Sequence, residues 1–177
     1  MHKPADLIAA AGAVISATAT TASDRIGMSE TVLAAGVFGH ALPSNAELAT
    51  AAAAASSLPH GGDSVVGGVI GAIENVTAMN AVQAMDAQRD GLAVRMLVAV
   101  TDSRIYLLDW TPGSGPKLIL KTLDRTTTDV TVQHFGLSRR IELLDHGTGV
   151  DAHIVGTTAM FSAEAPGDKA VLSLLEP

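Results

Sequence analysis

The sequence of 177 residues contains no cysteine, and only 3% of its residues are aromatic. Without cysteine the chain can form no disulfide, no thiolate nucleophile and no cysteine-ligated zinc or iron–sulfur site. This composition is compatible with the cytoplasmic location that we expect. Because aromatic side chains are scarce, the apolar 47% of the chain is mostly Ala, Val and Leu, so each buried residue contributes little area to a core.

The chain also has few basic residues. Eleven Lys and Arg face eighteen Asp and Glu, which gives a net charge of −7 and a pI of about 5.2. This balance argues against a nucleic-acid binder held by phosphate neutralisation. It argues equally against general adhesion of the whole protein to an anionic leaflet. We therefore expect no nucleic-acid partner, and membrane association has weak support.

The first 22 residues superficially resemble a secretory signal. Lys3, Pro4 and Asp6 precede an apolar run that is rich in Ala, Thr and Ser rather than Leu. A cleavable signal has a cleaner basic start and a stronger apolar core. Ala, Thr and Ser also gain little free energy in hydrocarbon. We expect neither a signal nor a membrane span here, although the sequence does not decide whether these residues form a targeting segment.

Composition changes sharply near Gly91. Residues 1–90 hold one aromatic residue, Phe38, and are rich in Ala, Gly, Ser and Thr, whereas the other four aromatic residues follow Gly91. The change predicts a helical oligomerisation or docking region at residues 1–90 and an antiparallel β domain at residues 91–177. The helices expected in the first region are Ala5–Ala22, Ser29–Leu42, Leu48–Ser57 and Asp63–Asp90.

The expected helix Asp63–Asp90 carries small residues at spacings of three and four, followed by apolar residues with a period near three. Small residues at this spacing allow a neighbouring helix to approach closely. The helix ends at Asp90-Gly91, where Gly can adopt the left-handed closing conformation. Either this region covers the sheet, or it associates between chains. The residues predicted to pack are Gly67, Gly68, Gly71, Val76, Met79, Val82 and Met85.

The second half alternates strand and turn. Met96–Trp110 is predicted to form a β-hairpin, because two runs of β-branched and apolar residues flank the polar turn Thr101–Arg104. Such short strands at regular spacing indicate an antiparallel meander. A short helix is expected to close it. The other predicted elements are strands at Lys117–Leu123, Asp129–Phe135, Arg139–Leu144 and Val150–Val155, and the helix Asp168–Leu175.

Six or seven meandering strands followed by one helix resemble the pleckstrin-homology (PH-like) fold, including its GRAM-like and bacterial relatives. The residues that carry the likeness are Leu97–Leu108, similar to the hairpin "apolar run, Thr-Asp-x-Arg, apolar run" of those domains. The resemblance covers about residues 91–177. It implies a phosphoinositide-binding or protein-binding module. The first hairpin lacks a basic cluster, so the protein-binding role fits better.

Two sets of polar residues are candidates for a site. Lys117, Lys121, Arg139 and Arg140 could bind an anionic lipid head group or an acidic partner, but edge-strand charge that discourages aggregation explains them more simply. His146, Asp151 and His153 could hold a metal, with His134 and Asp145 also in this half. A solvent-facing polar sheet surface explains their loose spacing more simply.

No catalytic motif stands out. Gly113-Ser114-Gly115 lacks the strand-to-helix context of a nucleophile elbow. Gly61-Gly62 has no following Lys-Ser/Thr and no preceding strand, so a phosphate-binding loop is not indicated. We therefore expect an α+β fold and a non-catalytic assembly or interaction subunit without cofactor or metal. The alternatives left open are a peripheral membrane or anionic-lipid-binding PH-like module and an unrecognised hydrolase or metal-dependent enzyme.

Overall fold

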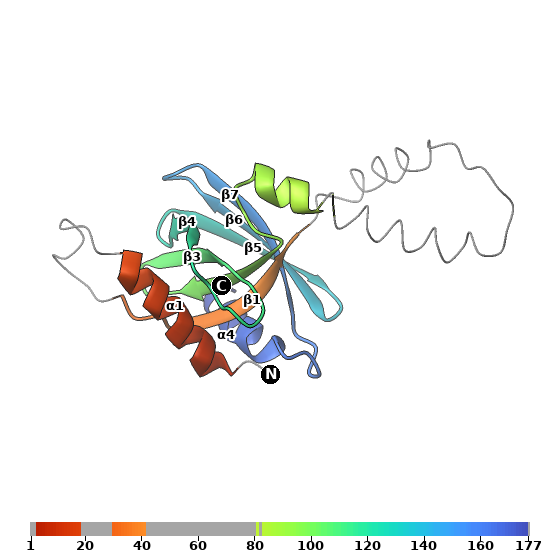
Figure 1. Ribbon diagram of the computed structural model, residues 1–177. Coiled ribbons are helices and arrows are strands. Elements are labelled where there is room, and N and C mark those ends of the chain that lie inside the picture. The colour runs from red at the N-terminus through yellow and green to blue at the C-terminus, as the bar shows by residue number, and fades with distance from the viewer. Residues whose placement is uncertain (1–2, 19–29, 42–80, 82, 177) are drawn as a thin grey trace, which may run out of the picture.

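A computed structural model describes residues 3–18, 30–41, 81 and 83–176 (Figure 1). Within them, seven strands form one antiparallel sheet and three segments are helical, so the fold class is α+β. The elements are α1 (Pro4–Thr18), β1 (Ala34–His40), a helix at residues 83–89, β2 (Arg95–Val100), β3 (Arg104–Asp109), β4 (Ile119–Asp124), β5 (Thr128–Phe135), β6 (Ser138–Asp145), β7 (Val150–Thr157) and α4 (Ala165–Leu175).

The strands lie in the order β4-β3-β2-β1-β7-β6-β5. The inner core combines side chains of β2 and β3 with side chains of β6, β7 and α4, so the two ends of the sheet face a common interior. Helix α4 contributes Val171, Leu172 and Leu175 to this interior. Leu175 lies on the same side of the helix as both other residues, because residues three and four apart share a face.

A second core lies on the other face of β1, β2 and β3. Leu7, Ala11 and Ile15 recur every four residues of α1 and are buried against these strands. In β2, Met96, Val98 and Val100 belong to the inner core, whereas Leu97 and Ala99 lie under α1. The central strands are therefore buried on both faces, not half-buried as the sequence pattern suggested.

The predicted hairpin at Met96–Trp110 is confirmed as β2 and β3. The strands predicted downstream are confirmed as β4 to β7 with shifts of one or two residues at their ends. The closing helix is also confirmed. It begins at Ala165 rather than Asp168, because Pro166 lies in its first turn, where a missing N–H costs no hydrogen bond.

The helix expected at Ser29–Leu42 is wrong, because residues 34–40 form β1. β1 lies at the centre of the sheet and pairs with β2 from Ala34 to Gly39. A strand buried on both faces shows no polar alternation, so the sequence Ala-Ala-Gly-Val-Phe-Gly resembled an Ala-rich helix. The described parts of residues 1–90, α1 and β1, thus pack in the same cores as the second half.

The helix predicted at Ala5–Ala22 is confirmed by α1 as far as Thr18. The predicted end of the helix Asp63–Asp90 is also confirmed: residues 83–89 are helical and Gly91 has a φ of 67°. The rest of that helix and the predicted helix Leu48–Ser57 lie outside the described residues. The oligomerisation or docking role of residues 1–90 stays a prediction.

Candidate functional site

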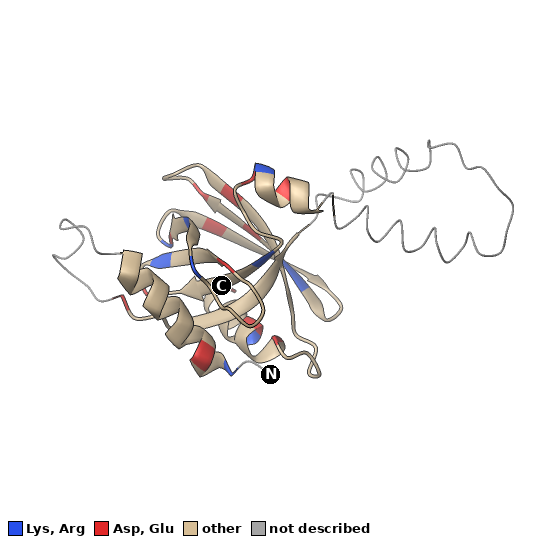
Figure 2. Cartoon of the chain, in the orientation of Figure 1, with Lys and Arg blue, Asp and Glu red and all other residues tan. Residues whose placement is uncertain are grey.

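The structure does not gather the four basic residues predicted as an anion site. Lys117 precedes β4 and Lys121 lies in it, whereas Arg139 and Arg140 lie in β6, and four strands separate β4 from β6 in the sheet (Figure 2). Arg139 Nη1 donates hydrogen bonds to the carbonyls of Gly136 (2.7 Å) and Ser138 (3.0 Å). The two pairs therefore have to be considered separately.

Most of the residues predicted to pack helices together lie outside the described part of the chain, namely Gly67, Gly68, Gly71, Val76, Met79 and Val82. Met85 is described, and its side chain is 71% exposed on the helix at residues 83–89. The same helix buries Ala87 in the inner core. Met85 thus points away from the sheet, where it is accessible to another protein surface.

The histidines form separate pairs rather than one cluster. His146 Nε2 lies 2.8 Å from Asp129 Oδ2, and His153 Nε2 lies 3.2 Å from Asp151 Oδ1. His134 lies 3.8 Å from Glu176. Within the described residues no three His, Asp or Glu side chains are grouped so that they could hold a metal ion. The sharing of one strand face by Asp151 and His153 is confirmed, but no described metal site includes them.

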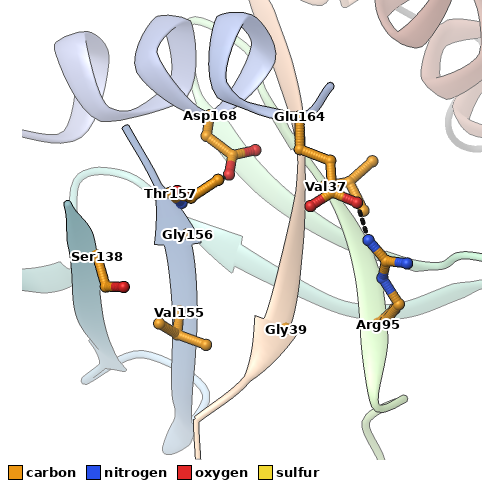
Figure 3. Close-up of a pocket in the computed structure, with 9 residues that line it drawn as sticks. All are labelled: Val37, Gly39, Arg95, Ser138, Val155, Gly156, Thr157, Glu164 and Asp168. Carbon is orange, nitrogen blue, oxygen red and sulfur yellow. Dashed lines mark hydrogen bonds and ion pairs between the residues drawn. The ribbon is translucent and has the colours of Figure 1, made fainter. Parts of the chain in front are cut away.

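A pocket of about 270 Å³ lies at the seam where β1 and β7 part (Figure 3). The ladder between these strands has two residue pairs, Gly39–Val155 and His40–Ile154. Beyond them the first turn of α4 packs against β1 at Gly36 and reaches β7 through Asp168. The lining residues are Val37, Gly39, Arg95, Ser138, Val155, Gly156, Thr157, Glu164 and Asp168.

Asp168 bridges this seam with a fully buried carboxylate. Its Oδ2 accepts a hydrogen bond from the backbone N–H of Thr157 (2.9 Å), and Oδ1 has no hydrogen-bond partner. Burial raises the pKa of Asp168 to about 7, although the N–H groups of Thr157 and Val37 and the charge of Arg95 favour the ionised form. The free oxygen is closed off from solvent and does not face the open part of the pocket. The carboxylate therefore ties α4 to β7 through Thr157.

Two glycines make room for this bridge. A Cβ at Gly36 would lie 2.8 Å from the backbone N of Asp168, and a Cβ at Gly156 would lie 2.4 Å from the Phe38 ring. Arg95 and Glu164 form an ion pair at the rim of the pocket (Figure 3). None of the nine lining residues is a histidine or a lysine. Arg95, the only basic residue among the nine, is therefore paired with Glu164, and the carboxylate of Asp168 is buried. This arrangement is suited to holding the sheet together.

Two other polar clusters connect loops to the sheet. Buried Asp145 accepts hydrogen bonds from Thr127 Oγ1 (2.5 Å), Thr148 Oγ1 (2.7 Å) and the N–H of Gly147 (2.9 Å), which lower the pKa of Asp145. They join the β4–β5 turn to the β6–β7 turn.

Glu30 accepts hydrogen bonds from Ser103 and Tyr106 and holds the segment before β1 against the β2–β3 hairpin. Burial, with Glu30 beside it, raises the pKa of Tyr106, so its hydroxyl stays protonated as the donor to Glu30. The cluster around Glu30 and the cluster around Asp145 both serve the fold.

The sequence analysis missed an exposed apolar surface, which we call the apolar tip: Phe135, Leu137, Met160 and Phe161. Phe161 is fully exposed, and the other three are more than half exposed. The first two flank the β5–β6 turn, where Gly136 has a φ of 59°, and the last two lie in the β7–α4 loop. The signal available in the sequence was an apolar residue on each side of a turn glycine, where polar residues are the rule.

Hydrogen bonds hold the two loops of the apolar tip together. The N–H and the hydroxyl of Thr158 both donate to the carbonyl of Leu137, at 2.7 and 3.0 Å. Figure 1 shows the β5–β6 hairpin and the loop that leads into α4 projecting from the same side of the molecule. The four apolar side chains thus belong to one local surface.

Comparison of the chain with family models, with curated proteins and with solved structures found no match in any of the three. The PH-like resemblance therefore stays a prediction. Among the described residues there is no helix with the length and apolar character needed to cross a bilayer.

Proposed function

We propose that the protein is a non-catalytic interaction subunit, in which a PH-like sheet carries a self-associating or docking segment between β1 and β2. Two antiparallel meanders, β1–β4 and β5–β7, joined by pairing of β1 with β7 and followed by a C-terminal helix, support the PH-like part of this proposal. The small-residue pattern around Gly67–Gly71 supports the docking part.

The observation that carries the proposal is how the sheet holds both ends of this segment. The chain leaves β1 at Ala41, whose N–H donates to the carbonyl of His153 (2.9 Å). It returns at Gln83, whose Nε2 donates to the carbonyl of His40 (2.7 Å). His40 Nε2 also lies 3.4 Å from Asp90 Oδ2. A long connection fixed at both ends on a rigid sheet is typical of functional loops.

The test removes only the connection. Deletion of residues 1–90 would remove α1 and the central strand β1, so it would destroy the sheet rather than test docking. We would instead replace residues 42–80 by a flexible Gly/Ser linker. Size-exclusion chromatography with light scattering should show concentration-dependent association for the full chain and a folded monomer for the deletion variant.

A full chain that is monomeric at every concentration and that matches the deletion variant would contradict self-association. Circular dichroism and the urea midpoint of both proteins provide the control, because the deletion should leave the sheet intact. The alternative of an anionic-lipid-binding module remains a second proposal. Such a module would not use all four basic residues together, since Lys117 and Lys121 lie in a different part of the sheet from Arg139 and Arg140.

A further inference from the structure

The apolar tip exposes more apolar side chain than folding requires. Two phenylalanines, one leucine and one methionine lie in loops where water contacts most of each side chain. Single exposed apolar residues are common on protein surfaces, but several together mark an interaction site. Because Thr158 ties the two loops through the carbonyl of Leu137, the four side chains are presented together without a large ordering cost on binding.

The charge around the apolar tip differs from that of the whole protein. Residues 135–141 and 156–163 contain two arginines and no carboxylate, although the chain carries a net charge of −7. Arg139 is held beside the turn by the carbonyls of Gly136 and Ser138. The neighbouring carboxylates are paired: Glu142 lies 3.6 Å from Arg140, and Glu164 pairs with Arg95. Arg140 is therefore balanced by Glu142, and Arg139 is the positive charge that makes the apolar tip locally basic.

The shape of the apolar tip favours a lipid bilayer as its binding partner. The four apolar residues lie at the end of the β5–β6 hairpin and in the β7–α4 loop, and the backbone of both segments projects from the sheet (Figure 2). Projecting aromatic and aliphatic side chains beside arginines suit the border of a bilayer, where apolar groups enter the acyl region and cations stay at the phosphates. Anionic lipids would complement Arg139.

We propose that the apolar tip docks the protein on an anionic lipid surface, with Leu137 and Phe161 entering the acyl border and Arg139 facing the phosphates. This inference does not depend on self-association through residues 42–80. A single apolar tip should bind lipid weakly, because it offers few side chains to the bilayer. Association between chains would strengthen the binding by avidity.

The test is flotation of the full chain with vesicles of phosphatidylcholine alone and with vesicles that also contain phosphatidylglycerol. We expect binding to the anionic vesicles, weakened by salt, and little binding to phosphatidylcholine alone. The double variant Leu137→Ser/Phe161→Ser should lower the partition coefficient at least tenfold. The matched control is Leu118→Ser, because Leu118 and Leu137 are both 64% exposed but lie at distant strands.

A second pair of variants tests the charge. Arg139→Gln should lower partition to anionic vesicles severalfold, whereas Lys117→Gln should leave it unchanged. Absence of vesicle binding, or equal loss with Leu118→Ser and with the double variant, would overturn the proposal. Light scattering on the same samples separates it from self-association: if the double variant changes the oligomeric state instead of lipid partition, the occupant is a second copy and the lipid proposal is wrong.

Discussion

Two parts of the sheet, represented by β2 and β5, differ in how they are covered. In β2, five of six residues are buried, because α1 packs on one face of the strand and the shared interior lies on the other. In β5, no residue is fully buried, and apolar and polar residues alternate along the strand. Sequence composition explains the difference, since Met-Leu-Val-Ala-Val offers apolar side chains to both faces and Thr-Asp-Val-Thr-Val offers them to one.

The part of the sheet that contributes most to stability differs from the part that exposes an apolar surface. The β1–β3 part lies between two apolar cores, so its side chains contribute most to the free energy of unfolding. The β5–β6 part leaves one face and its turn in water, and the apolar tip lies there. Substitutions should therefore affect stability strongly in the first part and binding in the second.

The largest expected effect is that of Leu97→Ala in β2. Leu97 is fully buried beneath α1, so its truncation should lower the free energy of unfolding by about 2–5 kcal/mol. The same change at Leu144 in β6, where the side chain is 41% exposed, should cost about 1 kcal/mol or less. Urea unfolding of both variants measures the difference. Equal losses would show that α1 is not a true layer of the fold.

The sequence predicted the β half of this fold well. The hairpin around Thr101–Arg104 and the later strands combine β-branched residues with clear turns, which are local signals. β1 was missed because its sequence, Ala-Ala-Gly-Val-Phe-Gly-His, is buried on both faces and so shows no alternation of apolar and polar residues. Its place beside β2, more than fifty residues away along the chain, is a non-local pairing that composition does not encode.

The sites were less predictable than the fold. The bridge made by Asp168 depends on Gly36 and Gly156, which lie far apart in the sequence and allow two strands and a helix to meet. The grouping of Leu137 with Phe161 depends on a tertiary hydrogen bond from Thr158. The four basic residues lie on separate strands, β4 and β6, for the same reason, because strand order decides which neighbours on the sheet are close.

Asp168 lies where the two parts of the sheet separate, and its ionisation should weaken that seam. The unfolded-state pKa is near 3.8 and the folded-state pKa is about 7, so the folded protein retains a proton that the unfolded chain has lost. The contribution of Asp168 to stability is therefore full below about pH 4 and is lost as pH rises to about 7. The whole difference corresponds to about 4 kcal/mol.

The comparison is between the wild type and Asp168→Asn, unfolded in urea at intervals from pH 5 to pH 8. Asparagine is neutral at each pH, and its side-chain oxygen can still accept from Thr157. The variant should gain stability relative to the wild type as pH rises. A difference that does not vary with pH would mean that Arg95 and the two N–H groups keep the carboxylate ionised throughout.

A smaller effect should come from two matched glycine substitutions. Gly36→Ala places a methyl group against the backbone of Gly167 and Asp168, which cannot rotate away, so we expect a loss of about 1–3 kcal/mol. Gly12→Ala in α1 meets nothing within 4 Å and should stabilise the protein by up to about 1 kcal/mol. Opposite signs in urea unfolding would confirm the close contact of α4 with β1. A neutral Gly36→Ala would contradict it.

The smallest effect on stability should be that of the apolar tip. Leu137→Ser and Phe161→Ser remove side chains that water already surrounds, so the free energy of unfolding should change by no more than about 0.5 kcal/mol. Thermal and urea unfolding of the double variant check this. A loss well above that value would mean that the tip packs within the folded chain, and its exposure would no longer indicate a partner. An unchanged stability together with lost vesicle binding would place the role of these residues outside the fold.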